Sequence, residues 1–119
     1  MTIGKALNEY FNSFGINAYP DTSDLEGVTF PYMTYSTQVD GFGHEVSITA
    51  QAWFKTDSEA TPNAKVKEIM EAIGMGGKTL AYDDGIMWLK CGNPFCINST
   101  AQNDASLKLR QMNITIEFL

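Results

Sequence analysis

The segment GGKT, residues 76–79, is the first of a few groups in this 119-residue chain whose side chains could do chemistry. It matches the end of a phosphate-binding P-loop, which also needs a glycine at position 72, where this chain has Ala72. The order of elements is also reversed, because a P-loop joins a strand to a helix and this segment follows an expected helix. We therefore expect a helix stop and a turn here, and no nucleotide-binding site.

Two cysteines and one histidine are the other reactive groups. Cys91 and Cys96 flank GNPF, and a zinc site would need two further ligands at suitable spacing. We expect free thiols beside a tight loop; a disulfide would require Cα atoms within about 7 Å. His44 has no activated nucleophile and orienting acid near it in sequence, and Asp83-Asp84 is ordinary turn chemistry. We expect no catalytic, cofactor-binding or metal-binding residues, and so no enzyme.

Size and charge exclude several classes of protein. Hydrophobic residues make up 44% of the chain, which predicts one folded domain over residues 1–119. Eight basic residues against fourteen acidic ones give a net charge of −6. This balance argues against specific nucleic-acid binding and against docking on an anionic membrane. The sequence shows no apolar run of about 18 residues and no signal-peptide pattern, so we expect a cytoplasmic origin.

The hydrophobic periodicity predicts two helices. Apolar residues from Ile3 to Phe14 recur at helical spacing, with Thr2 as the expected cap and Gly15 as the expected stop. A second helix is expected to begin near Thr61-Pro62 and to end at Gly74.

Strand patterns fill the rest of the chain. Residues 15–29 read as a polar connection, and residues 30–36 and 45–54 as two strands joined through the turn signal DGFG. In the second strand, the even-numbered residues Val46 to Phe54 are apolar and should face the core. Together these residues predict a long antiparallel hairpin over 30–54.

The C-terminal half also alternates. Asp84-Gly85 predicts a hairpin over residues 78–91, and residues 94–98 and 107–119 read as further strands. The apolar parity of the last strand slips by one, which predicts a β-bulge near Arg110-Gln111. The expected fold class is α+β, a mostly antiparallel sheet with a long β-hairpin and two helices packed on one face.

The order of these elements resembles a known family. A short N-terminal helix, a strand opening with Phe30, Pro31 and Tyr32, and an alternating strand ending in Trp53 and Phe54 are followed by a helix and a β-rich half. This arrangement is similar to the tail terminator (tail-completion, or head–tail joining) proteins of long-tailed bacteriophages and prophages, over nearly the whole chain.

The resemblance implies a structural role in the virion tail, with assembly in the cytoplasm of the bacterial host. Such a protein forms a homomeric ring, six-fold in this family, that caps the head-proximal end of the tail tube and stops its polymerisation. Its implied partners are other copies of itself, the tail tube protein and the head-completion or connector protein, while DNA passes through without specific binding.

Long exposed strand edges invite aggregation unless a neighbour covers them. We therefore expect the hairpin to be an assembly element, with these candidate oligomer-interface residues: Tyr32, Thr34, Ser36, Phe42, His44, Glu45 and Trp53. The alternative class is a small monomeric ligand- or peptide-binding module, because an aromatic content of 12% could line a pocket. A concave apolar pocket would favour the module, whereas self-association or binding to a tail end would favour the ring.

Overall fold

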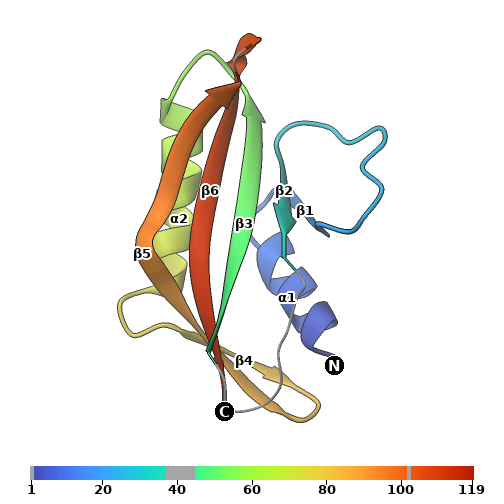
Figure 1. Cartoon of the computed structure of the whole chain (residues 1–119), viewed down its shortest axis with the longest axis vertical. Helices are drawn as coiled ribbons and strands as arrows, with labels where there is room; N and C mark the ends of the chain where they lie inside the picture. The colour runs from blue at the N-terminus through green and yellow to red at the C-terminus, as the bar shows by residue number, and fades with distance from the viewer. Residues whose placement is uncertain (1, 37–44, 102) are drawn as a thin grey trace.

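The computed structural model describes residues 2–36, 45–101 and 103–119 (Figure 1). Within these residues the elements are α1 (Ile3–Asn12), β1 (Asn17–Pro20), β2 (Tyr32–Tyr35), β3 (Glu45–Lys55), α2 (Ala60–Ile73), β4 (Lys78–Tyr82), β5 (Gly85–Ala101) and β6 (Asp104–Phe118). The strands form one sheet in the order β1-β2-β3-β6-β5-β4. Only β1 and β2 are parallel neighbours, so the α+β class and the mostly antiparallel sheet are confirmed.

Helix α1 begins where the sequence predicts and ends earlier. The Thr2 hydroxyl accepts the Lys5 N–H at 3.2 Å, which satisfies one of the free N–H groups of the first turn. The helix ends at Ser13, whose N–H donates to the Tyr10 carbonyl. Gly15, with φ of 82°, then turns the chain toward β1.

Helix α2 begins one residue before the predicted Thr61 and ends as predicted. Glu59 occupies the cap position, and the Ala60 N–H donates to the Ser58 hydroxyl at 3.1 Å. Gly74 has φ of 74°, a left-handed value that glycine adopts without strain, and it ends the helix. No helix among residues 2–36, 45–101 and 103–119 is long and apolar enough to cross a membrane.

Strand β1 lies in the segment 15–29, which the sequence predicts to be a connection. Its register is held from both sides. On one side Asn17–Pro20 pairs with β2; on the other, the Asn12 side chain accepts the Ala18 N–H at 2.9 Å and donates to the Ala18 carbonyl at 3.1 Å. An asparagine amide thus takes the place of a further strand.

The pairing of β3 differs from the predicted hairpin. Tyr32–Tyr35 of β2 pairs with Ala50–Trp53, and the long ladder of β3 runs instead against β6, from Glu45↔Glu117 to Lys55↔Leu107. The long hairpin over 30–54 is therefore not confirmed, and residues 37–44 lie outside the described part of the chain. The hairpin between β4 and β5 is confirmed, with Tyr82 paired to Gly85.

The predicted bulge near Arg110-Gln111 is wrong. Strand β6 keeps one register against β3, and its pairing with β5 shifts register in two places, between Cys91 and Cys96 and between Thr100 and Ala101. The even-numbered residues of β6 from Lys108 to Phe118 are buried without interruption. The parity slip in the apolar pattern therefore arises because Lys108 and Arg110 occupy the buried side of the strand, and not because a residue is inserted.

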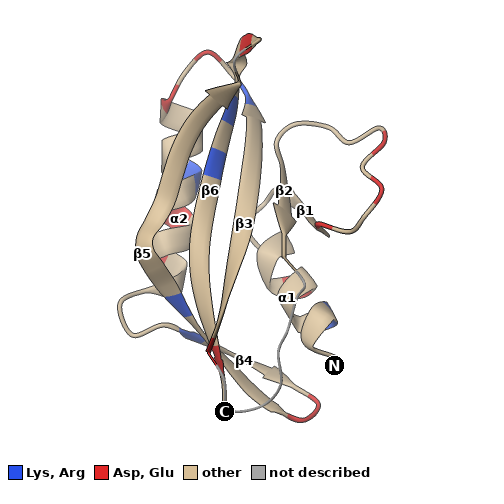
Figure 2. Ribbon diagram, viewed as in Figure 1, with Lys and Arg blue, Asp and Glu red and all other residues tan. Residues whose placement is uncertain are grey.

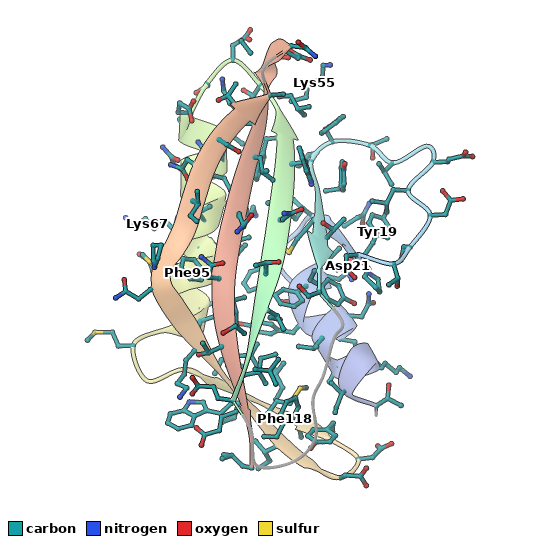
Figure 3. The ribbon with its side chains drawn as sticks, viewed as in Figure 1. Tyr19, Asp21, Lys55, Lys67, Phe95 and Phe118 are labelled. Atoms are coloured by element: carbon teal, nitrogen blue, oxygen red, sulfur yellow. The ribbon has the colours of Figure 1, made fainter. Side chains whose placement is uncertain are left out.

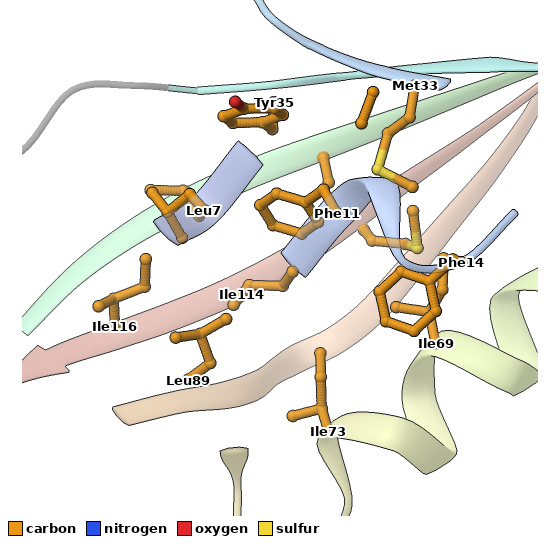
Figure 4. Packing of buried hydrophobic residues seen from close by; sticks show 14 of the residues in the cluster. Leu7, Phe11, Phe14, Met33, Tyr35, Ile69, Ile73, Leu89, Ile114 and Ile116 are labelled. Carbon is orange, nitrogen blue, oxygen red and sulfur yellow. The ribbon is translucent and has the colours of Figure 1, made fainter. Parts of the chain in front are cut away.

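One hydrophobic cluster joins the sheet to residues of both helices. Leu7 and Phe11 of α1 and Ile69 and Ile73 of α2 lie in it, with even-numbered residues of β3 and β6 (Figure 4). On β3, the residues from Ile48 to Phe54 alternate between buried even positions and partly exposed odd ones. The odd-numbered side of these strands is thus outside the core.

Candidate functional site

The segment GGKT forms a turn between α2 and β4. Gly77 has φ of 81°, and a Cβ atom there would lie 2.6 Å from the Leu89 carbonyl oxygen. The Trp88 indole N–H donates to the Gly76 carbonyl at 2.8 Å. Only glycine fits this close approach, so Gly77 has a structural reason that needs no phosphate.

The two cysteines are free and half-buried. Burial raises the pKa of both thiols, so both stay protonated at neutral pH and react slowly. No group of three or more His, Cys, Asp or Glu side chains suited to a metal ion occurs in the part of the chain that the structure describes. His44 lies outside that part.

We predict that Cys91 and Cys96 are needed neither for function nor for metal binding. The unfolding free energy of the double Cys91→Ser/Cys96→Ser variant should be no more than about 3 kcal/mol below that of the wild type, which is the range of ordinary point changes. Thermal melting measures the loss, and elemental analysis of the purified wild type should find no stoichiometric zinc. Zinc at one ion per chain would contradict the prediction.

The predicted interface residues that the structure describes share one side of the sheet. Trp53 is an odd-numbered residue of β3, and Tyr32 stacks on it with ring centroids 6.5 Å apart. Ser36 lies beside Thr49, with hydroxyl oxygens 3.2 Å apart. Thr34 is only 8% exposed, so it offers little area to a partner. Phe42, like His44, lies outside the described residues.

We call this side the neutral face, because its middle has no charged side chain. It consists of the outward-pointing residues of four neighbouring strands: Tyr32, Ser36, Ser47, Thr49, Gln51, Trp53, Ile97, Ser99, Leu109, Gln111, Asn113 and Thr115. Figure 1 views it with α2 behind the sheet, and Figure 2 shows the middle of β3 free of charge. The basic positions coloured on β6 are Lys108 and Arg110, which are buried on the other side.

Ion pairs stand at the two ends of the neutral face. At one end Lys90 lies 3.2 Å from Glu45 and 3.5 Å from Glu117, and the hydrogen bond to Glu45 raises the pKa of the Lys90 ammonium. At the other end Lys55 lies 3.3 Å from Asp104. Depletion of charge at the centre is one of the features that protein–protein interfaces share.

A charged cluster of two buried cations and the exposed Glu59 lies on the opposite side of the sheet. Arg110 is 1% exposed and binds the Glu59 carboxylate and the Asn63 amide oxygen, the latter at 3.2 and 3.3 Å. Lys108 lies 3.6 Å from the same carboxylate. The hydrogen bond from Arg110 lowers the pKa of Glu59. The cluster links the start of α2 to β6. In the sequence it is indicated by the slip in the apolar alternation of the last strand, where Lys108 and Arg110 stand at core-facing positions.

An apolar pocket opens where α2 ends against β5. Its volume is about 590 Å³, and it is lined by Met70, Glu71, Gly74, Met75, Lys90 and Cys91. Met75 is fully exposed and Met70 is 43% exposed. Two flexible methionines at an open pocket suit an apolar or aromatic group of varied shape.

Comparison with known proteins assigns no family: no family model matches the chain, and no curated protein is significantly similar to it.

Proposed function

We propose that this protein is a structural component of a phage tail, a homomeric ring that caps the head-proximal end of the tail tube. The observation that carries the proposal is the neutral face, a broad side of the sheet with aromatic and neutral polar residues; among the described residues its ion pairs stand at its ends. In this proposal both helices pack on the even-numbered side and leave the neutral face for partners. The six-fold number comes from the family resemblance.

The proposed ring gives each surface a role. Contacts between copies close the ring and end growth, because a head-to-tail contact whose rotation closes makes a ring instead of a fibre. The tail tube protein and the head-completion protein bind the two ends of the ring. An acidic chain with a net charge of −6 suits a channel that lets DNA pass, because a basic lining would hold the phosphates.

A charge placed in the neutral face tests the proposal. We expect Gln111→Glu to melt within about 0.5 kcal/mol of the wild type, because Gln111 is on the outward side of β6. In a phage that depends on this chain, the same change should lower the yield of infectious particles at least about tenfold, since an unpaired charge in an interface costs more than 1.4 kcal/mol.

The matched control is Asn103→Asp, the same gain of one charge at an exposed residue of the turn between β5 and β6. It should leave both stability and particle yield unchanged. If Gln111→Glu gave the full yield of infectious particles, the neutral face would have no part in assembly.

The second candidate is a ligand-binding module, which the apolar pocket favours. A pocket of about 590 Å³ falls in the size range of small-molecule sites. Met70→Trp would fill it from α2. Loss of a bound apolar ligand in this variant, with particle assembly unaffected, would favour the module over the ring.

A further inference from the structure

The two edges of the sheet differ in what covers them. The β1 edge is closed by Asn12, which bonds both outward main-chain groups of Ala18. On the other edge β4 pairs with β5 only as far as Leu89. From Phe95 to Thr100 the outer main-chain groups of β5 have no hydrogen-bond partner among residues 2–36, 45–101 and 103–119. One edge is thus shut and the other is open.

The open edge is interrupted at one end by Pro94 and the register shift between Cys91 and Cys96, and beyond them it lacks the charged side chains that protect many exposed strands. From Cys91 to Ala101 there is no charged side chain, and Ile97 is 49% exposed. A free, uncharged edge of this kind pairs readily with another extended segment. The apolar pocket with Met70 and Met75 adjoins this edge at Cys91. Together they form one surface, on which a row of free main-chain N–H and C=O groups ends at the apolar pocket.

A segment of matching chemistry lies on the opposite side of the molecule. The loop of residues 21–31 projects from the sheet beyond β2, while β5 forms the other flank (Figure 1). Its residues 27–30 carry no charge and make no main-chain hydrogen bond to any other described residue. Phe30 is 42% exposed, and its ring packs beside Tyr32 with centroids 5.3 Å apart. The loop therefore offers free main-chain groups and an exposed aromatic ring.

Charge also distinguishes the two flanks. The chain has no Lys or Arg between Lys5 and Lys55, and the loop carries Asp21, Asp24 and Glu26. Figure 2 shows acidic positions on the loop, and Figure 3 shows Lys67 of α2 extending on the same flank as Phe95. Lys67 is 72% exposed. When copies are placed side by side, the acidic loop of one copy would meet a flank whose exposed cation is Lys67, held by a surface pair with Glu71 at 3.9 Å that contributes little stability.

We propose that residues 27–30 of one copy add as a strand to the open β5 edge of the next copy, with Phe30 seated in the pocket between Met70 and Met75. This proposal rests on the proposed ring and names the contact that joins its subunits. The contact is head-to-tail, because the closed β1 edge cannot pair with the β5 edge of a neighbour. The methionine sulfurs and the Phe30 ring supply the apolar anchor, and the main-chain bonds supply direction.

Cysteine trapping tests this contact. In a Cys91→Ser/Cys96→Ser background of the full chain, Phe30→Cys and Met75→Cys are introduced singly and together, and the concentrated protein is oxidised and run without reductant. The double variant should give a ladder of dimers, trimers and higher species, because each chain carries both halves of the contact. Each single variant should stay monomeric. Thr29→Cys with Met75→Cys serves as a second pair if the Phe30 variant melts early.

The other outcomes overturn the proposal. A dimer from Met75→Cys alone would mean that two β5 flanks meet symmetrically, and the absence of any cross-link in both double variants would mean that the flanks do not meet. Neither result would contradict the proposed function at the tail end, because that function is tested separately by the shape of the tails in a lysate without the protein. A ladder together with normal tails in the absence of the protein would instead separate the self-association from the proposed function.

Discussion

Replacing Ile48 with aspartate is expected to lower the unfolding free energy by several kcal/mol, the largest loss among the changes considered. Ile48 is 3% exposed, and it lies opposite Ile114 in the ladder between β3 and β6. A carboxylate there would have no cation beside it, and leaving a buried charge unpaired costs about 3–5 kcal/mol. That is a large share of the roughly 5–15 kcal/mol that holds a domain together. Urea unfolding followed by circular dichroism measures the loss.

The neighbouring residue provides the control. Ser47 is exposed on the neutral-face side of β3, so Ser47→Asp should shift the unfolding free energy by no more than about 0.5 kcal/mol. If Ser47→Asp collapsed the protein while Ile48→Asp unfolded like the wild type, the register of β3 would be off by one residue.

Replacing Arg110 with alanine is expected to have the next largest effect. The change removes hydrogen bonds to Glu59 and Asn63 and leaves a void where a fully buried side chain stood. Lost charge-assisted bonds and a cavity together should cost about 2–4 kcal/mol. Arg110→Met, which keeps most of the volume, should lose less. Lys55→Ala, which removes an exposed pair with Asp104, should lose no more than about 1 kcal/mol.

The Arg110 effect should also depend on pH. Because the bond to Arg110 lowers the pKa of Glu59 in the folded state, the stability from this pair is present above the unfolded pKa of a glutamate. It is lost as the pH falls through the lowered, folded-state value. The difference in unfolding free energy between wild type and Arg110→Ala should therefore shrink in acid. A gap that stayed constant from neutral pH into strong acid would show that volume, and not the ion pair, sets the cost.

The sequence predicts well what simple periodicity determines. The apolar spacing from Ile3 to Phe14 locates α1, and Gly74 marks the end of α2 because only glycine adopts its φ of 74° without strain. The alternation in β3 gives its buried side correctly at Ile48. These signals are local, so one sequence suffices to read them.

Features that depend on distant residues were missed. Strand β1 has one buried residue, Ala18, and is held by Asn12, which no local pattern shows. The parity slip of β6 predicts a bulge, whereas its cause is that Lys108 and Arg110 occupy core-facing positions, which is rare for cations unless they are paired. Their partner, Glu59, lies about fifty positions away in the chain. The pairing of β3 with β6 could not be predicted either, because the two strands are far apart in the sequence and local patterns indicate only pairs of consecutive strands.

The candidate surface was predicted in part. Tyr32, Ser36, Glu45 and Trp53 lie on one side of the sheet because alternation sets the direction of each side chain. Their continuation over β6 and β5, through Gln111 and Ile97, follows from strand order, which the sequence does not reveal. The open β5 edge and the pocket near Met75 depend on the same long-range order.

The measurement that tests the central claim most directly is deletion of this gene from the phage or prophage that carries it, followed by electron microscopy of the lysate. A ring that caps the tail tube must stop its growth and offer the surface to which the filled head binds. The account predicts overlong or ragged tails without heads, restored to normal when the wild-type chain is supplied in trans. Normal tails on infectious particles in the deletion lysate would contradict it.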